Sequence, residues 1–199
     1  MQSKDKIVIF VHGYKGDQNE LGFLKEVFEN RGYQYLSFKY GKRNKKDEIV
    51  DLAEAEKEVA RFINLATSNV NPQTITVVGY SLGAAVAVRL CAENKIQCNC
   101  LIVISVFDSR SDLLKERGIS LSSDEDITPA DLVKKFPAST KLFFIHGVDD
   151  KSVGINRSRR VFLAAKKSNP TMVICKAGHQ FNTSQEKNEL KLCIDYIIN

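Results

Sequence analysis

The sequence lacks the features of a membrane-spanning or nucleic-acid-binding protein. No run approaches the roughly 18 apolar residues that a transmembrane helix needs, and the polar opening segment, Met1 to Lys6, has no apolar leader region. The formal net charge of +5, from 29 basic and 24 acidic residues, is too mild for a dedicated nucleic-acid binder. We therefore expect a cytoplasmic protein with no membrane span and no nucleic-acid partner.

The chain also lacks the cysteine spacing of disulfide frameworks and metal sites. It has five cysteines, an odd number, and no two of them have C-x-x-C spacing. Cys98 and Cys100 form only a C-x-C pair, which is a weak metal or redox signal. Free thiols in a reducing compartment are the simpler interpretation. A chain of 199 residues can bury roughly 70% of its unfolded surface, so the core needs neither a disulfide nor a metal.

What the sequence does contain is a regular alternation of short β-branched runs and longer helical patterns. Runs such as IVIFV and LIVIS are almost continuously apolar, which is typical of strands buried on both faces of a parallel sheet. The alternation predicts an α/β fold, with a doubly wound, mostly parallel six-stranded sheet and helices on both faces. The predicted strands are Lys6–Val11, Tyr33–Phe38, Thr74–Gly79, Cys100–Val106, Lys141–His146 and Thr171–Lys176.

Helical patterns lie between these strands. The apolar residues of 47–66 recur at spacings of three and four, which predicts an amphipathic helix. Residues 82–93 are small and apolar nearly all round, so we expect a buried helix there, and further helices over 155–167 and 184–198. At helix starts, Thr183 and Glu186 have capping-box spacing, and Thr128–Pro129 reads as an N-cap followed by a first-turn proline.

The long connection at 107–140 stands out from the rest of the chain. It is charged, with scattered Leu and Ile. One interpretation is a functional cover over a site, and the other is an ordinary crossover carrying two short helices. Since no repeat or linker interrupts the chain, we interpret residues 1–199 as a single domain with 107–140 as a short cap or crossover region.

The most specific motif is GYSLG at residues 79–83. It follows a predicted strand and opens a predicted helix. A turn this tight forces its serine into a strained backbone conformation, and the flanking glycines remove the Cβ clashes that the turn would cause. The hydroxyl is then held at the positive end of a helix. We therefore predict that Ser81 is a catalytic nucleophile, with a plain turn as the alternative.

A serine hydroxyl needs a base to take its proton, and the chain has three histidines. His12, His146 and His179 each follow a predicted strand, so all three are expected near the carboxyl edge of the sheet. His179 comes after the nucleophile and after an acid, in a loop where an imidazole can move between partners. We predict His179 as the base and hydrogen-bonded structural roles for His12 and His146.

The base needs an orienting acid, and the oxyanion needs hydrogen-bond donors. Asp150, after the fifth predicted strand, is our first choice for the acid, followed by Asp149 and then Asp108. For the oxyanion hole we predict the backbone N–H groups of Leu82 and Tyr14. The alternative for the Tyr14 loop is an ordinary flexible strand–helix connection.

Taken together, these motifs resemble those of the α/β-hydrolase family. The matching pieces are FVHGY after the first strand, GYSLG, HGVDDKSV after the fifth strand and AGH after the sixth. Their order, Ser81, Asp150 and His179, is the order that the family uses. In that family HG-x-x-D-x-x-V is a familiar acid-loop pattern, which favours Asp150 over Asp149. The resemblance implies the family's fold, an acyl-enzyme mechanism, and no cofactor or catalytic metal.

The chain departs from the family pattern in two ways. The two extra strands with which members usually begin have no room here, so we expect a minimal version of the fold. The short cap region argues against a large lid of the lipase type. We predict a serine hydrolase that cleaves a carboxylic ester or thioester of a small-molecule or acyl substrate. The alternatives are a peptidase or amidase with the same triad, or a non-catalytic binding module with the same fold.

Two basic clusters are less specific signals. The first follows the second predicted strand, and it is either a solvated loop or a docking surface for an acidic partner such as an acyl carrier protein. The second lies near the acid loop, where it could meet an anionic substrate or simply face water. The first cluster comprises Lys39, Lys42, Arg43, Lys45 and Lys46, and the second comprises Arg157, Arg159 and Arg160.

Overall fold

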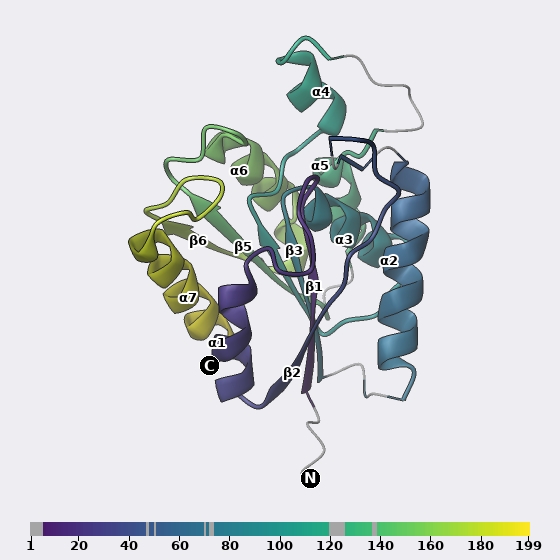
Figure 1. The fold of residues 1–199 in the computed structure, drawn as a ribbon, viewed down its shortest axis with the longest axis vertical. Coiled ribbons are helices and arrows are strands. Elements are labelled where there is room, and N and C mark those ends of the chain that lie inside the picture. The colour runs from purple at the N-terminus through teal and green to yellow at the C-terminus, as the bar shows by residue number, and fades with distance from the viewer. Residues whose placement is uncertain are drawn as a thin grey trace.

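The computed structural model describes residues 6–46, 48–49, 51–69, 71, 74–119, 126–136 and 139–199. Its centre is a six-stranded sheet of order β2-β1-β3-β4-β5-β6, in which every neighbouring pair is parallel (Figure 1). The predicted parallel α/β architecture is therefore confirmed. The strands are β1 (Lys6–Val11), β2 (Tyr33–Ser37), β3 (Ile75–Tyr80), β4 (Cys100–Ile104), β5 (Lys141–Gly147) and β6 (Thr171–Cys175).

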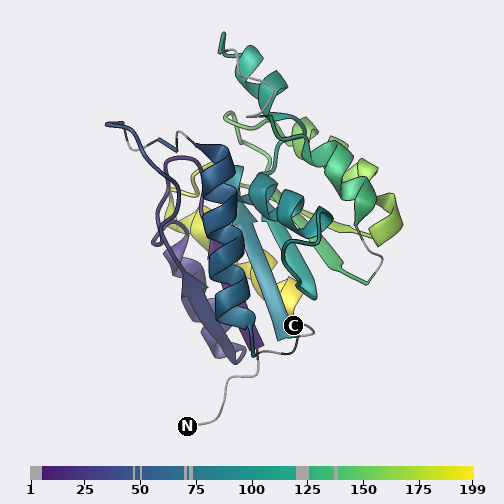
Figure 2. The same cartoon turned by 90° about the vertical axis from the view of Figure 1, so that its right-hand side faces the viewer.

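Helices cover both faces of this sheet. α1 and α7 lie on one face, and α2, α3 and α6 cover the other (Figures 1 and 2). No helix among the described residues is long and apolar enough to cross a membrane. The helices are α1 (Lys25–Asn30), α2 (Leu52–Thr67), α3 (Leu82–Ala92), α4 (Arg110–Lys115), α5 (Pro129–Leu132), α6 (Ile155–Ala164) and α7 (Ser184–Ile198).

The apolar runs of the central strands divide their side chains between the two helical layers. In β1, Val8 and Phe10 pack into the core beneath α1 and α7, while Ile7, Ile9 and Val11 pack into the core beneath α2 and α3. Successive side chains of a strand point to opposite faces, so a strand covered on both sides must be apolar at every position. This is the physical reason for the continuous runs seen in the sequence.

Most helix boundaries agree with the sequence patterns, and the differences have local causes. The capping box predicted for Thr183 and Glu186 is present at the start of α7. α2 begins at Leu52 rather than near residue 47, because the Asp51 side chain accepts a hydrogen bond from the Glu54 amide and caps the helix there. Residues 47 and 50 of that predicted helix lie outside the described residues.

Two predictions about helices were incomplete. Pro129 opens α5 as expected, but the Thr128 side chain makes no capping hydrogen bond. α1 was missed, because its single buried residue, Phe28, leaves no apolar periodicity to recognise. In the connection 107–140 the described residues form α4 and α5, while 120–125 and 137–138 lie outside the described part.

The strand order creates one place where the loops of neighbouring strands diverge. The chain leaves β1 for β2 at the edge and then returns to β3 on the other side of β1. Ligands of open α/β sheets bind beyond the carboxyl ends of the strands at such a switch point. The loop after β1 and the turn after β3 therefore meet at this edge, and α4 stands beyond it at the top of Figure 1.

Candidate active site

Ser81 occupies a strained turn between β3 and α3. Its backbone has φ 53° and ψ −117°, in a region that costs a non-glycine residue about 1–3 kcal/mol. The strain is held by the sheet, because the Ser81 amide donates to the carbonyl of Ile104 in β4 at 2.9 Å. The side chain stays only half-buried at the start of α3. The sharp turn predicted from GYSLG is present.

The two glycines of the motif make this turn possible. A Cβ at Gly79 would lie 2.5 Å from the Cα of Ala84 in α3. A Cβ at Gly83 would lie 2.2 Å from the carbonyl oxygen of Val11, at the end of β1. Both distances are far below van der Waals contact. Only glycine therefore lets α3 pack this closely against the ends of β3 and β1.

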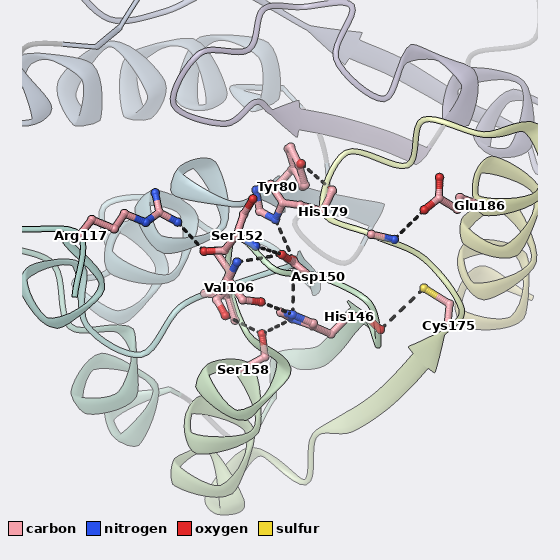
Figure 3. A network of polar contacts seen from close by, with 12 residues as sticks. Tyr80, Val106, Arg117, His146, Asp150, Ser152, Ser158, Cys175, His179 and Glu186 are labelled. Atoms are coloured by element: carbon pink, nitrogen blue, oxygen red, sulfur yellow. Dashed lines mark hydrogen bonds and ion pairs between the residues drawn. The ribbon is translucent and has the colours of Figure 1, made fainter. Parts of the chain in front are cut away.

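Asp150 and His179 are joined by a hydrogen bond at the same edge of the sheet. His179 Nδ1 lies 2.7 Å from Asp150 Oδ2, and the Asp150 side chain is fully buried (Figure 3). The other carboxylate oxygen accepts from the amides of Ser152 and Val153 at 2.9 and 2.8 Å. Burial by itself would raise the pKa of Asp150. The bond from His179, its positive charge and the Val153 amide outweigh burial, and the pKa lies below the usual value.

The loop that carries His179 is fixed at two further points. Tyr80, the residue before Ser81, donates its hydroxyl to the His179 carbonyl at 2.7 Å, and the two rings lie 5.2 Å apart. The Gly178 amide donates to Glu186 of α7 at 2.7 Å. Among the contacts of the described residues, none joins Ser81 Oγ directly to the imidazole. With Nδ1 on Asp150, Nε2 is the nitrogen that could serve the hydroxyl.

His12 is a buried structural histidine. Its side chain is fully buried, stacks on the Tyr40 ring at 4.1 Å between centroids, and has its Nε2 3.3 Å from the Tyr40 amide. Burial lowers the pKa of His12 to about 4, although the Gly13 carbonyl opposes it, and the neighbouring Arg43 lowers it further. His12 is therefore neutral at physiological pH and does not reach the solvent-facing edge.

His146 lies directly behind Asp150. Its Nδ1 is 2.6 Å from Ser158 Oγ, and its Nε2 is 2.7 Å from the Val153 carbonyl and 3.4 Å from Asp150 Oδ2 (Figure 3). Burial is the largest cause of its lowered pKa, and the charge of Asp150 opposes it. All three histidines lie at or just beyond the carboxyl ends of their strands, but only the half-buried His179 pairs with the acid through a short hydrogen bond.

The other two acid candidates lie elsewhere. Asp149 is exposed, and its backbone amide donates to the Ala177 carbonyl at 3.0 Å. Asp108 is buried and ion-pairs with Arg157 at 2.6 Å and with Arg160. Burial would raise the pKa of Asp108, but the hydrogen bonds from these two arginines hold it below its usual value. Two arginines of the second basic cluster are thus engaged by a carboxylate.

The loop after β1 packs against the serine turn and contains a carboxylate that the sequence analysis missed. A Cβ at Gly13 would lie 3.4 Å from the Ser81 Cβ, so this loop lies close beside the candidate nucleophile. The Gly13 amide donates to Glu20 Oε2 at 2.5 Å. The signal available in the sequence was an acid within reach of a glycine-containing loop, which is too common to be specific. Tyr14, the predicted oxyanion donor, is partly exposed beside it.

No ligand cluster accompanies these side chains. Within the ranges that the structure describes, no group of three or more His, Cys, Asp or Glu side chains could hold a metal ion. The five cysteines are free thiols, and Cys98 Sγ lies 3.5 Å from Cys91 Sγ.

Comparison with known families now bears on this geometry. A family described as "Putative serine esterase (DUF676)" matches residues 1–109, which include the β1 loop and the Ser81 turn. The chain belongs to this family of serine esterases. No curated protein matches the esterase in sequence.

Solved structures show the same fold at low sequence identity. The Pyrococcus furiosus esterase Pf2001 superposes with a TM-score of 0.75 at 21% identity, covering 98% of this chain and 81% of that chain. Est1E from Butyrivibrio proteoclasticus, with ferulic acid bound, gives 0.74 at 15% identity, covering 97% and 88%. Mouse alpha/beta hydrolase domain-containing protein 10 gives 0.69 at 16%, covering 96% and 89%. The chain is a serine ester hydrolase with the α/β-hydrolase fold.

Proposed function

We propose that this esterase cleaves carboxylic esters and thioesters through an acyl-enzyme intermediate, with Ser81 as nucleophile, His179 as base and Asp150 as the orienting acid. The observation that carries the proposal is the 2.7 Å contact between Asp150 and His179 at the edge where the strained Ser81 turn lies. An acid on Nδ1 fixes the tautomer and orients Nε2 for the serine hydroxyl. Catalytic hydrogen bonds are often long without substrate and tighten when it binds.

Each step of the proposed reaction conserves its protons. Ser81 Oγ attacks the carbonyl carbon while His179 takes the hydroxyl proton. The N–H groups of Leu82 and Tyr14 stabilise the oxyanion. The imidazolium then protonates the leaving alcohol or thiol as its bond to the carbonyl carbon breaks. Water then gives a proton to His179 and attacks the acyl-enzyme. The tetrahedral intermediate that forms collapses, which releases the carboxylic acid and returns the proton from His179 to Ser81.

Replacing the nucleophile tests this proposal. Ser81→Ala should abolish turnover of a short p-nitrophenyl ester while the thermal unfolding temperature stays near that of the wild type. A fluorophosphonate probe should label the wild type once, at Ser81 by mass spectrometry. Ser68→Ala, at an exposed serine, is the matched control and should keep both turnover and labelling. Full turnover by Ser81→Ala, or a folded wild type that the probe does not label, contradicts the mechanism; the second result favours a binding module.

The leaving group is tested separately. A panel of esters, acyl thioesters and amides of graded acyl length should show turnover of the first two classes and not of the third. A higher kcat/KM for amides than for the matching esters would favour the peptidase or amidase alternative.

We also propose an acidic acyl carrier protein as a partner at the loop after β2. Lys42, Lys45 and Lys46 are exposed there, whereas Arg43 turns inward and donates to the Gly16 carbonyl at 2.7 Å. That contact ties the basic loop to the loop after β1, beside the candidate site. Exposed charges of one sign speed the encounter with a partner of the opposite sign. Arg43 is thus a correction to the exposed cluster expected from the sequence.

Charge reversal tests the partner. The triple change of Lys42, Lys45 and Lys46 to Glu should lower kcat/KM for a carrier-bound acyl thioester, with the difference shrinking at high salt. Turnover of the same acyl group on a small neutral thiol should not change. An equal loss on both substrates, or no loss on the carrier-bound one, contradicts this proposal.

We propose one domain in which 107–140 is a short cap or crossover, supported by the burial of Ile127, Val133 and Phe136 in the core that contains α3. A single cooperative unfolding transition tests it.

We propose a cytoplasmic location, which is compatible with the five free thiols. Subcellular fractionation tests it, and an oxidised chain recovered outside the cytoplasm would contradict it.

A further inference from the structure

Glu20 connects the loop after β1 to the candidate site. It lies seven residues beyond Gly13, just before the short 3-10 helix Gly22–Leu24, and its Oε2 accepts the Gly13 amide at 2.5 Å. A Cβ at Gly16 would lie 2.0 Å from the same oxygen, so only glycine leaves room for the carboxylate there. Arg43 holds the Gly16 carbonyl at 2.7 Å. The loop is therefore held by a carboxylate and by a guanidinium.

The carboxylate of Glu20 and the side chain of Ser81 both lie close to Gly13. The point where a Gly13 Cβ would lie is 3.2 Å from Glu20 Oε2 and 3.4 Å from the Ser81 Cβ. The Gly13 amide is thus committed to Glu20, which fixes the backbone one residue before Tyr14. In the proposed mechanism the Tyr14 N–H stabilises the oxyanion, so a fixed Gly13 sets the direction of that donor.

Glu20 is half-buried at this position. Burial raises its pKa above the usual value, although the Gly13 amide and then the positive charge of His179 oppose burial. The short hydrogen bond from the Gly13 amide is therefore the contact through which Glu20 acts on the loop.

We propose that Glu20 is a positioning residue of this esterase: its carboxylate accepts the Gly13 amide and so holds the loop that presents the Tyr14 N–H. The inference rests on the proposed function, because it assigns Glu20 a part in stabilising the oxyanion formed by Ser81. A donor stabilises a developing oxyanion when its direction is fixed before the reaction.

Two substitutions test the hydrogen bond to Gly13. Glu20→Ala removes the acceptor, so kcat should fall about tenfold with KM nearly unchanged, because the oxyanion donor is no longer held. Glu20→Gln removes the charge but keeps an oxygen that can accept the Gly13 amide, so it should retain most of the wild-type kcat. Steady-state kinetics with a short p-nitrophenyl ester measure both.

The matched control is Glu48→Gln, which removes a half-buried carboxylate paired with Lys15 on the adjoining loop. It should leave kcat and KM at their wild-type values. If Glu20→Ala keeps the wild-type kcat, or if Glu20→Gln loses as much as Glu20→Ala, the inference is overturned. Thermal unfolding checks the fold, and if Glu20→Ala does not fold, Glu20→Met, which keeps the side-chain length but offers no oxygen acceptor, takes its place in the same comparison.

Failure of this inference can be told from failure of the proposed function. Fluorophosphonate labelling of Ser81 is measured on the wild type and on each Glu20 variant. If the wild type is labelled and active but the Glu20 variants have wild-type kinetics, the role of Glu20 is contradicted while the mechanism is not. If the wild type is not labelled and Ser81→Ala keeps full turnover, the mechanism is contradicted, and the role of Glu20 with it.

Discussion

Asp150 and Asp108 are two buried carboxylates in corresponding places. Each follows one of two neighbouring strands, β5 and β4, and their exposures are 5% and 8%. Each has a pKa held below its usual value against the effect of burial. They differ in their partner, which is the imidazole of His179 for Asp150 and the guanidinium groups of Arg157 and Arg160 for Asp108.

The partner, rather than burial or charge, decides what each carboxylate can do. An imidazole can gain or lose a proton near neutral pH, so the Asp150 pair can take part in proton transfer. A guanidinium stays charged throughout the physiological range, so the Asp108 pair is a permanent ion pair. It fastens the segment after β4 to α6, whereas Asp150 orients a base.

The largest expected difference is in catalysis. Asp150→Asn should lower kcat about 10³- to 10⁴-fold, because an amide no longer stabilises the imidazolium or fixes the tautomer of His179. Asp108→Asn should leave kcat nearly unchanged. Steady-state kinetics with a short ester measure both. A large loss for Asp108→Asn with little for Asp150→Asn would reverse the assignment of the acid.

The next difference is in stability, where a change at Asp108 should be more destabilising than a change at Asp150. Asp108→Ala should lower the free energy of unfolding by about 3 kcal/mol, because the buried Arg157 loses a carboxylate partner. Asp150→Asn should cost less, since its side-chain oxygen can still accept the Ser152 and Val153 amides. Urea unfolding of the two variants gives the comparison, and equal stabilities would show that the two carboxylates are held alike.

Both carboxylates should make the unfolding free energy fall as the pH is lowered into the acid range. Both have a folded pKa below the usual 3.8, so as the pH falls the unfolded chain binds their protons first. Stability from each is therefore present above that usual value and is lost as the pH falls through the lowered folded value. Each Asn variant should flatten the acid slope of unfolding free energy by up to about 1.4 kcal/mol per pH unit. Slopes as steep as that of the wild type would contradict the shared behaviour.

The smallest effect should come from the exposed end of the arginine network. Glu116 pairs with Arg157 at 2.6 Å, but its side chain is 69% exposed. Glu116→Gln should change the unfolding free energy less than any variant above, and the change should disappear at high salt because exposed pairs are screened. Urea unfolding at low and high salt measures it. A loss as large as that of Asp108→Ala would show that the exposed carboxylate carries the network.

Much of the fold and part of the site could be predicted because their causes are local. A run such as IVIFV must be buried on both faces wherever it lies, and its alternation with helices leads to a parallel sheet. The GYSLG turn needs glycine at 79 and 83, and the structure shows the backbone contacts that a Cβ would break. The proximity of Asp150 and His179 followed from the rule that the carboxyl ends of parallel strands share an edge.

The sequence by itself determined the sheet, the covering helices other than α1, and the strained position of Ser81, because backbone conformation and periodic burial depend on neighbouring residues. The tertiary structure alone decided the partners of Asp108, Arg43 and Glu20. Asp108 ion-pairs with two arginines, Arg43 turns inward to the Gly16 carbonyl, and Glu20 accepts a hydrogen bond from the Gly13 amide. The Asp108 and Arg43 pairings join residues at least 27 positions apart along the chain, and the geometry of all three depends on how complete strands and helices pack.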